Sequence, residues 1–346
     1  MDSIKIGEFI IGENSKPFVI AEMSGNHNQS LQRALDIVKA AADAGAHALK
    51  LQTYTPDTMT IKGALTINDS NSLWNGRELY DLYIEAFTPW EWHKIIFDYA
   101  KELGMIAFST PFDETAVDFL EELGVELYKV ASFENTDWPL LKRVAQTGKP
   151  VIMSIGAANL SDIDEAVRIL RSNGCRELVL LKCTSTYPST PENTNIITIP
   201  HMKQLFQCHV GLSDHTMGIG VAIGAVALGA CVIEKHFTLK REDGGVDSAF
   251  SIEPEELRNL VIETERAFLS LGKVHYGVLK AEEKSLTFKR SLFCVQDIKK
   301  GETFTKSNVK VLRPGTGLLP RYYEIVLGKV ASQDIKKGTA ISWSNL

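Results

Sequence analysis

The sequence predicts an α/β fold in which a (β/α)8 TIM barrel is followed by a small C-terminal β-rich domain. Three observations lead to this prediction. Eight short apolar, β-branched runs alternate with amphipathic helical patterns. The length of 346 residues suits a barrel domain of ~250 residues plus an appendage. A repeated segment near the end of the chain indicates that this appendage is a unit of its own.

Each of the eight predicted strands is followed by a helical pattern, and glycine ends several of these helices. One helix, "SDIDEAVRILRSNG", is predicted to begin at Ser161 as N-cap, with Asp164 three residues on. The rival fold is a doubly wound open sheet, which the lack of a GxGxxG motif after the first strand disfavours. The predicted strands are 18–23, 48–54, 105–110, 127–132, 150–156, 178–185, 209–215 and 232–238.

The connection after the second strand is unusually long, spanning residues 55–87. Structureless loops longer than about 15 residues are uncommon in compact domains. This one contains Trp74, Tyr80, Tyr83 and Phe87, so we expect it to pack. It leaves the C-terminal end of the barrel, where ligands bind.

The end of the chain differs from the rest in charge and pattern. "QDIKKGETFTKSNV" (296–309) recurs as "QDIKKGTAISWSNL" (333–346), and residues 286–346 carry 11 Lys and Arg against 4 Asp and Glu. We predict a catalytic barrel domain at 1–279, a linker at 280–290 and a pseudo-symmetric β domain at 291–346. The basic charge favours a lid over an anionic substrate, because the interleaved aromatic residues typical of nucleic-acid binding are absent.

The composition, with 44% hydrophobic and 23% charged residues, is typical of a soluble globular protein. The sequence contains no apolar run of about 18 residues, so we expect no membrane span. Its first residues lack the pattern of a signal peptide. The five cysteines form no CxxC pair. We therefore expect buried, reduced thiols and a cytoplasmic protein.

Polar side chains close nearly every predicted strand, at the end of a barrel where catalytic residues lie. Lys50 and Lys129, ringed by hydroxyl groups, suit a ligand with a phosphate and a carboxylate. Alternatively the lysines pair with Glu22, Glu134 or Glu234, or one of them forms a Schiff base. The strand-end residues are Glu22, Lys50, Gln52, Ser109, Thr110, Lys129, Ser132, Ser154, Lys182, Thr184, Ser185, Ser213, His215, Glu234 and His236.

His215 and His236 end neighbouring strands and so could share one metal ion, although a structural role is the alternative for each. With only two clear protein ligands, such an ion would have open coordination positions, which water and substrate would fill. Glu234 lies on the same face as His236 and could be a third ligand, a supporting group or a base.

Motifs along the whole chain resemble the sialic acid synthase family: "AEMSGNHNQ", "FSTPFD", "YKVAS", "MSIGAA", "CTSTYP", "GLSDHT", "EKHFTL" and "DIKKG". The segments "SLWNGRELYDLYIEAFTPWEWH", "DGGVDSAFSIEP" and "RPGTGLLPRYY" look most like the pseudaminic acid synthase branch of that family. Val246 stands where relatives usually have Pro.

The resemblance implies a condensation of phosphoenolpyruvate with an open-chain amino-sugar aldehyde, in which C–O cleavage releases phosphate. It implies that His215 and His236 hold a divalent metal, Mn2+ or else Mg2+ or Co2+, and that Glu22 or Glu234 handles the proton of water. The branch implies 2,4-diacetamido-2,4,6-trideoxy-altrose as the sugar, with N-acetylmannosamine, the substrate of N-acetylneuraminate synthases, as the alternative. Residues implied to contact substrate are Lys50, Lys129, Thr110, Ser132, Ser154 and Ser213 for phosphoenolpyruvate, Gln52, Glu134, Tyr187 and Asp247 for the sugar, and Ser185.

The resemblance further implies a C-terminal antifreeze-like (SAF) domain that crosses a homodimer to cover the partner's site. Arg313, in "LRPGTG", matches the position that reaches the partner's substrate. Two other kinds of function compete with the synthase: a Schiff-base lysine aldolase or lyase, and a non-catalytic carbohydrate- or ice-binding protein suggested by the tail domain alone.

Overall fold

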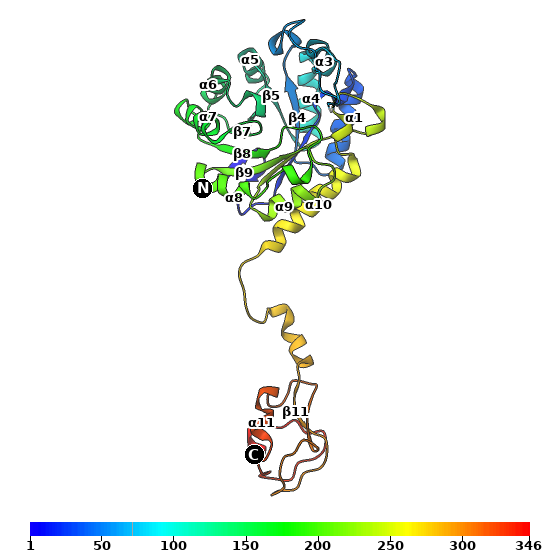
Figure 1. Cartoon of the computed structure of the whole chain (residues 1–346), viewed down its shortest axis with the longest axis vertical. Helices are drawn as coiled ribbons and strands as arrows, with labels where there is room; N and C mark the ends of the chain where they lie inside the picture. Colours follow the sequence, from blue (N-terminus) through cyan, green and yellow to red (C-terminus); the bar gives the residue numbers. More distant parts are fainter. Residues whose placement is uncertain (71) are drawn as a thin grey trace. The chain divides into compact units, whose positions relative to one another are not determined.

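The computed structural model describes residues 1–70 and 72–346 and divides them into two compact units, Met1–Gly272 and Lys273–Leu346. In the first unit the described residues form a closed barrel of eight parallel strands, which excludes the open sheet (Figure 1). Each predicted strand is confirmed to within two residues at either end. The barrel strands are β3 (Phe18–Glu22), β4 (Ala48–Thr53), β5 (Ile106–Pro111), β6 (Tyr128–Val130), β7 (Val151–Ser154), β8 (Leu178–Cys183), β9 (His209–Asp214) and β10 (Val232–His236).

Helices surround this barrel, as the amphipathic patterns predict (Figure 1). The helices that follow the barrel strands are α1 (Leu31–Asp43), α4 (Trp90–Glu102), α5 (Glu114–Glu122), α6 (Trp138–Gln146), α7 (Leu160–Ser172), α8 (Thr198–Phe206), α9 (Gly220–Ala227) and α10 (Pro254–Leu271). The predicted start of α7 at Ser161 is wrong. Asn159 is its N-cap, and its side chain accepts from the amides of Ser161 and Asp162 while Asp162 accepts from the amide of Asn159. Asn is as good a cap as Ser, and Asp162 completes the reciprocal pair two residues earlier than predicted.

Alternation along the strands decides which side chains face the barrel interior. Phe18 and Ile20 on β3 belong to the interior cluster, whereas Val19 and Ala21 pack against the helices. Because side chains alternate along a strand, the parity that places Ile20 inside also places Glu22 inside, at the C-terminal end. The apolar interior therefore continues directly into the polar strand ends.

A short hairpin at the N-terminus was not anticipated from the sequence. Strands β1 (Ile4–Ile6) and β2 (Phe9–Ile11) pair antiparallel around Gly7, whose φ is +54°. Ile4, Ile6 and Ile11 are buried in the interior cluster, with the residues at the N-terminal ends of the barrel strands. The hairpin thus closes the barrel end opposite the site, and its three-residue strands are too short to give a clear period.

The insert after β4 packs, as predicted from its aromatic residues, although residue 71 lies outside the described part of the chain. It contains α2 (Pro56–Met59) and α3 (Leu79–Ala86). The Tyr80 hydroxyl donates to Asp57 at 2.9 Å, and the ring of Tyr83 contacts that of Tyr54. The insert is therefore an ordered, packed part of the barrel's C-terminal face.

The second unit has its own core and uses the repeat symmetrically. Strands β11 (Ser291–Cys294) and β12 (Val309–Leu312) pair antiparallel, and a short α11 (Tyr323–Val326) follows. The two repeat copies pair with each other, since Ile298 bridges to Ile335, Lys299 pairs with Asp334 and Lys336 pairs with Asp297. In the predicted linker, Lys280–Phe288 forms an exposed 3-10 helix.

The five cysteines are buried and free, as expected from their apolar surroundings. Within the described ranges, none of the helices combines the length and the apolar character needed to cross a bilayer.

Candidate active site at the barrel mouth

The predicted strand-end residues meet in one buried cluster at the C-terminal end of the barrel. The Lys50 ammonium lies 2.6 Å from a carboxylate oxygen of Glu22 and 3.7 Å from one of Glu234. The Lys129 ammonium lies 3.8 Å from the same Glu234 oxygen. The alternative that the lysines pair with carboxylates is thus confirmed for both, with Glu22 and Glu234 as the partners of Lys50 and Glu234 as the partner of Lys129.

Hydroxyl groups surround the two ammonium groups. Lys50 donates to Thr110 Oγ1 at 3.1 Å, and Lys129 donates to Ser154 Oγ at 2.7 Å. Ser213 donates to Glu234 at 3.1 Å. Two cations with hydroxyl donors beside them match what a phosphate and a carboxylate require.

A close backbone approach at Gly156 gathers two more of the predicted hydroxyls. The Gly156 amide donates to Ser132 Oγ at 3.1 Å. A Cβ at Gly156 would lie 2.2 Å from Ser185 Oγ and 2.7 Å from Ser132 Oγ. A larger residue would have to push both serine hydroxyls aside, so the glycine leaves room for the hydroxyl-lined cradle that Ser132 and Ser185 form beside it.

Burial and mutual charge separate the pKa values of the four ionisable groups. Burial raises the pKa of Glu22, and the charge of Glu234 adds to this against the pull of Lys50. Burial would also raise the pKa of Glu234, but Lys129 and Lys50 outweigh it and lower that pKa. Burial lowers the pKa of Lys129, whereas Glu22 and Glu234 overcome the same effect at Lys50 and raise its pKa. Such divergence between neighbouring carboxylates is typical of acid–base sites.

The two histidines stand beside this cluster with their ring centroids 5.3 Å apart. His215 Nδ1 lies 3.1 Å from the carbonyl of Thr184, which fixes the proton on Nδ1 and leaves Nε2 with a lone pair. His236 Nδ1 is buried and has no hydrogen-bond partner among the described residues. Burial, followed by the nearby positive charges, holds the pKa of His236 well below its usual range.

This donor set fits a divalent metal with open positions. Metal ligation needs neutral imidazole with a free lone pair, which the lowered pKa of His236 provides. Burial would also lower the pKa of His215, but the hydrogen bond and charge of Cys183 outweigh it and raise that pKa, so a metal at His215 would displace a proton. Across the described ranges, no group of three or more His, Cys, Asp or Glu residues is arranged to hold an ion. Glu234 instead contacts the lysines and Ser213, so a metal here would have two protein ligands, with water and substrate completing its shell.

Aromatic and acidic residues line the side of the site nearest the histidines. The Tyr187 ring lies 4.5 Å from the His215 ring, and Phe250 contacts Tyr187 and His236 at 5.2 and 4.9 Å. Asp247 lies 3.8 Å from His236 Nδ1 and accepts from Ser24. Gln52 donates to Glu22 at 3.1 Å, and Glu22 pairs in register with His236. These predicted sugar contacts therefore border both the histidines and the ionic cluster.

The sequence did not single out Trp74 and Phe250 as site residues. Trp74 Nε1 donates to the carbonyl of Val246 at 2.9 Å, and the indole contacts Tyr187 with centroids 5.8 Å apart. The insert thus reaches the loop that carries Asp247. The signal available in the sequence was the aromatic content of the insert, which indicated packing but not its target.

Two of the predicted strand-end residues, Ser109 and Lys182, face away from the site, as does Asp214 beside Ser213. Ser109 bonds to Thr53 on the helix-facing side, and Lys182 donates to the carbonyl of Cys183 at 2.9 Å. Asp214 pairs with Lys235 outside the barrel interior. Their parity along the strands is opposite to that of Thr110, Cys183 and Ser213, so Ser109 and Lys182 are not site residues.

Arg313 belongs to the second unit, where it is exposed. Within the described residues it makes no hydrogen bond or ion pair, so its guanidinium is available for a ligand.

Glu134 supplies a pH-dependent contribution to stability. Burial raises its pKa to about 7 against the pull of Lys129. The unfolded carboxyl ionises near 4.5, so stability falls as the pH rises from there through 7. Glu134→Gln should reduce this fall by about 2 kcal/mol, measured by urea unfolding at pH 4.5 and 7.5. Exposed Glu122→Gln is the control, and an unchanged pH dependence in Glu134→Gln would contradict the raised pKa.

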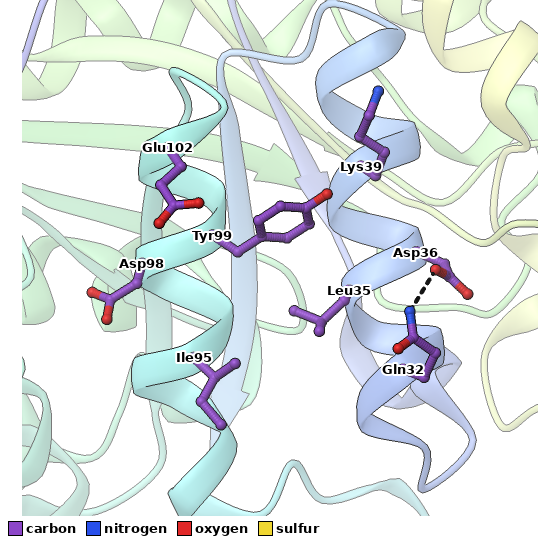
Figure 2. A pocket seen from close by; sticks show the side chains of 8 residues that line it. All are labelled: Gln32, Leu35, Asp36, Lys39, Ile95, Asp98, Tyr99 and Glu102. Carbon is purple, nitrogen blue, oxygen red and sulfur yellow. Dashed lines mark hydrogen bonds between the residues drawn. The ribbon is translucent and has the colours of Figure 1, made fainter.

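A groove between α1 and α4, on the outside of the barrel, has a cavity volume of about 460 Å³ (Figure 2). Three of its four charged residues are already engaged, since Asp36 accepts from Gln32, Lys39 pairs with Asp43 and Asp98 with Lys94. None of the predicted site residues lines it. The chemistry of the chain therefore lies at the barrel mouth.

Comparison of the sequence with models of known protein families identifies the class of protein to which this fold and site belong. The NeuB family model matches residues 37–276 and the SAF domain model matches residues 289–346. The chain belongs to the NeuB family, which confirms the resemblance found in its motifs.

Individual relatives narrow this class further. The chain is 44% identical to a pseudaminic acid synthase of Campylobacter jejuni, over 98% of both chains. It is 40% identical to the pseudaminic acid synthase of Helicobacter pylori, over 94% of this chain and 96% of that one. Among solved structures, an N-acetylneuraminic acid synthetase from Leptospira borgpetersenii in complex with citrate is similar, with a TM-score of 0.75 and 33% identity, over 82% of this chain and 95% of that one.

Proposed function

We propose that the chain is a pseudaminic acid synthase, which condenses phosphoenolpyruvate with 2,4-diacetamido-2,4,6-trideoxy-altrose to give a nine-carbon nonulosonic acid and phosphate. The observation that carries this proposal is the full-length similarity of 40–44% to three pseudaminic acid synthases. Relatives named N,N'-diacetyllegionaminic acid synthase are less similar, at 35–37%. The segments of the sequence that resemble the pseudaminic acid synthase branch favour the same choice.

In the proposed reaction the two lysines hold the phosphate and carboxylate of phosphoenolpyruvate. Thr110, Ser154 and the cradle at Gly156 offer hydroxyl donors around them. The buried site excludes water from these contacts, which strengthens them.

His215 and His236 would hold the divalent ion, Mn2+ or else Mg2+ or Co2+, which supplies Lewis-acid polarisation of the aldehyde oxygen. Tyr187, Asp247, Gln52 and Glu134 orient the sugar at the border of the cluster. The methylene carbon of phosphoenolpyruvate then attacks the aldehyde carbon, and water adds to the adjacent carbon as it becomes cationic.

Glu22 is the better candidate to take the proton of this water. Its raised pKa brings it closer to neutral pH, where a base is most effective. Glu234, whose pKa is lowered, stays ionised and balances the two lysines. Collapse of the tetrahedral intermediate expels phosphate by breaking the C–O bond.

The bond that breaks can be followed with phosphoenolpyruvate that carries 18O in the bridging position. C–O cleavage sends all of the label into inorganic phosphate, as mass spectrometry would detect. Label that remains in the nonulosonic acid would refute this step while leaving the condensation itself intact.

The sugar is tested by offering phosphoenolpyruvate with 2,4-diacetamido-2,4,6-trideoxy-altrose or with N-acetylmannosamine. We expect kcat/KM at least about 10²-fold higher for the first, because a site built for an acetamido group at C4 leaves polar groups unpaired with the second. A preference for N-acetylmannosamine would identify the chain as an N-acetylneuraminate synthase instead.

The second unit is proposed to cover the barrel of the partner in a domain-swapped homodimer, with Arg313 reaching the partner's sugar. Its net positive charge and the unpaired, exposed Arg313 support this arrangement. Heterodimers of one Arg313→Ala chain and one His215→Ala chain, isolated with two affinity tags, test it. One site of each heterodimer would have both residues intact, so we expect about half of the wild-type activity. Activity as low as that of either homodimer would contradict the crossing.

A Schiff-base aldolase is the second candidate, because burial lowers the pKa of Lys129, as a nucleophilic lysine requires. Its hydrogen bonds to Ser154 and to the carbonyl of Val130 favour anion binding instead. We expect borohydride with substrate to trap no adduct, and a trapped adduct at Lys129 would support the aldolase.

A further inference from the structure

Asp214 and Lys235 form an ion pair whose side chains have no exposed surface. They occupy matching positions on β9 and β10, where Lys235 pairs in register with Asp214. The Lys235 ammonium lies 2.8 Å from Asp214 Oδ2. None of the roles described for the site uses this pair.

Both members of the pair are flanked by site residues. Asp214 lies between Ser213 and His215, and Lys235 lies between Glu234 and His236. Because alternate residues face opposite sides of a strand, the pair lies on the helix side while its neighbours face the interior. One ion pair thus joins the two strands at the positions that carry the histidines.

The pair also fixes the backbone just beyond His215. Asp214 Oδ1 accepts from the amide and the hydroxyl of Thr216, at 2.9 and 2.8 Å. The Lys235 ammonium donates a further bond to the carbonyl of Thr216. Thr216 is therefore bound to both charges, and His215 is enclosed between Asp214 and Thr216.

The same segment is tied to the loop after β8. The amide of Ser189 donates to the carbonyl of His215 at 3.0 Å, and Ser189 bridges to Thr216. The backbone of His215 is thus anchored on both sides, and the backbone of His236 pairs with β3 at Glu22. The separation of the two rings depends on the junction between β9 and β10.

We propose that Asp214 and Lys235 are positioning residues that set the separation and orientation of His215 and His236, and thereby the affinity of the site for its divalent ion. This inference rests on the proposed metal role of the two histidines. A site with only two protein ligands depends strongly on their spacing, because no third side chain compensates for a misplaced ring. An ion pair costs desolvation energy that apolar packing would not, so stability alone does not account for placing it here.

The test is Mn2+ affinity, measured on the full chain by electron paramagnetic resonance titration without substrate. The double variant is Asp214→Asn with Lys235→Met. The Asn side chain keeps an oxygen that can accept from Thr216, while the ion pair between β9 and β10 is lost. Removing both charges together avoids leaving one of them buried and unpaired. We expect the dissociation constant for Mn2+ to rise about tenfold, with an altered spectrum of the bound ion.

A matched control separates positioning from general destabilisation. Glu121→Gln with Lys149→Met removes another lysine–carboxylate pair, 2.5 Å apart, at the end of α5 and before the start of β7, away from the C-terminal strand ends that carry the site. It should leave Mn2+ affinity unchanged. Unfolding curves for both double variants ensure that affinities are compared on folded protein.

If the first double variant does not fold, Thr216→Val tests the positioning role instead. It removes the hydroxyl that donates to Asp214 in an isosteric change, and we expect weaker Mn2+ binding in the same direction. Wild-type affinity in every folded variant would overturn the positioning role while leaving the metal site in place. If the wild type itself binds no Mn2+, the metal role fails and this inference fails with it.

Discussion

Replacing either His215 or His236 with alanine is expected to lower metal-dependent turnover by about 10³-fold or more while the protein stays folded. Both rings lie at the proposed metal position, and among the described residues there is no third ligand to retain the ion. Loss of one imidazole leaves a single protein donor, which holds a divalent ion weakly. Turnover measured against Mn2+ concentration tests this.

His209 provides the matched control, since it begins β9, the strand that His215 directly follows, at the opposite end of the barrel. Its Nε2 contacts the backbone carbonyl of Asp2 at 2.8 Å. His209→Ala should keep the wild-type dependence on Mn2+. Full activity of the wild type after treatment with a chelator would contradict the metal role directly.

Replacing Lys129 with methionine is expected to lower kcat/KM for phosphoenolpyruvate by about 10²-fold or more. Methionine fills a similar volume but carries no charge and donates no bond to Ser154. Glu234 would also lose one of the two cations that lower its pKa. Initial rates against phosphoenolpyruvate concentration, at saturating sugar, measure the effect.

Lys182→Met is the control for this prediction. Lys182 also ends a barrel strand, but it faces the helix side and bonds to backbone. Its loss should change kcat/KM for phosphoenolpyruvate by less than about threefold. A similar small change in Lys129→Met would argue that Lys129 only balances Glu234.

The sequence sufficed to predict the barrel and most of the site for one physical reason. Parallel barrel strands are buried on both faces, so they are recognisable as continuous apolar runs. Their side chains alternate strictly, so the polar residue at a strand end can be assigned to the interior from its parity. This reasoning brought Lys50, Lys129 and His236 together correctly, and the same rule would have placed Lys182 outside.

Other features depend on tertiary contacts that no local pattern encodes. Trp74 reaches the carbonyl of Val246 across 172 residues of sequence. The N-terminal hairpin is stabilised by its isoleucines, which pack into the barrel interior. Its three-residue strands are too short to show a pattern in the sequence. The opposite pKa shifts of Glu22 and Glu234 follow from their distances to two ammonium groups and from their burial.

The proposed barrel mouth has a metal half at His215 and His236 and an anion half at Lys50 and Lys129. Crystals grown with Mn2+ and phosphoenolpyruvate, with anomalous diffraction collected at the manganese edge, test it most directly. We predict one anomalous peak within about 2.3 Å of a nitrogen of each histidine, and phosphate density beside the two ammonium groups. A peak elsewhere in the molecule would contradict the metal role of the two histidines, and phosphoenolpyruvate bound away from both lysines would contradict the anion site.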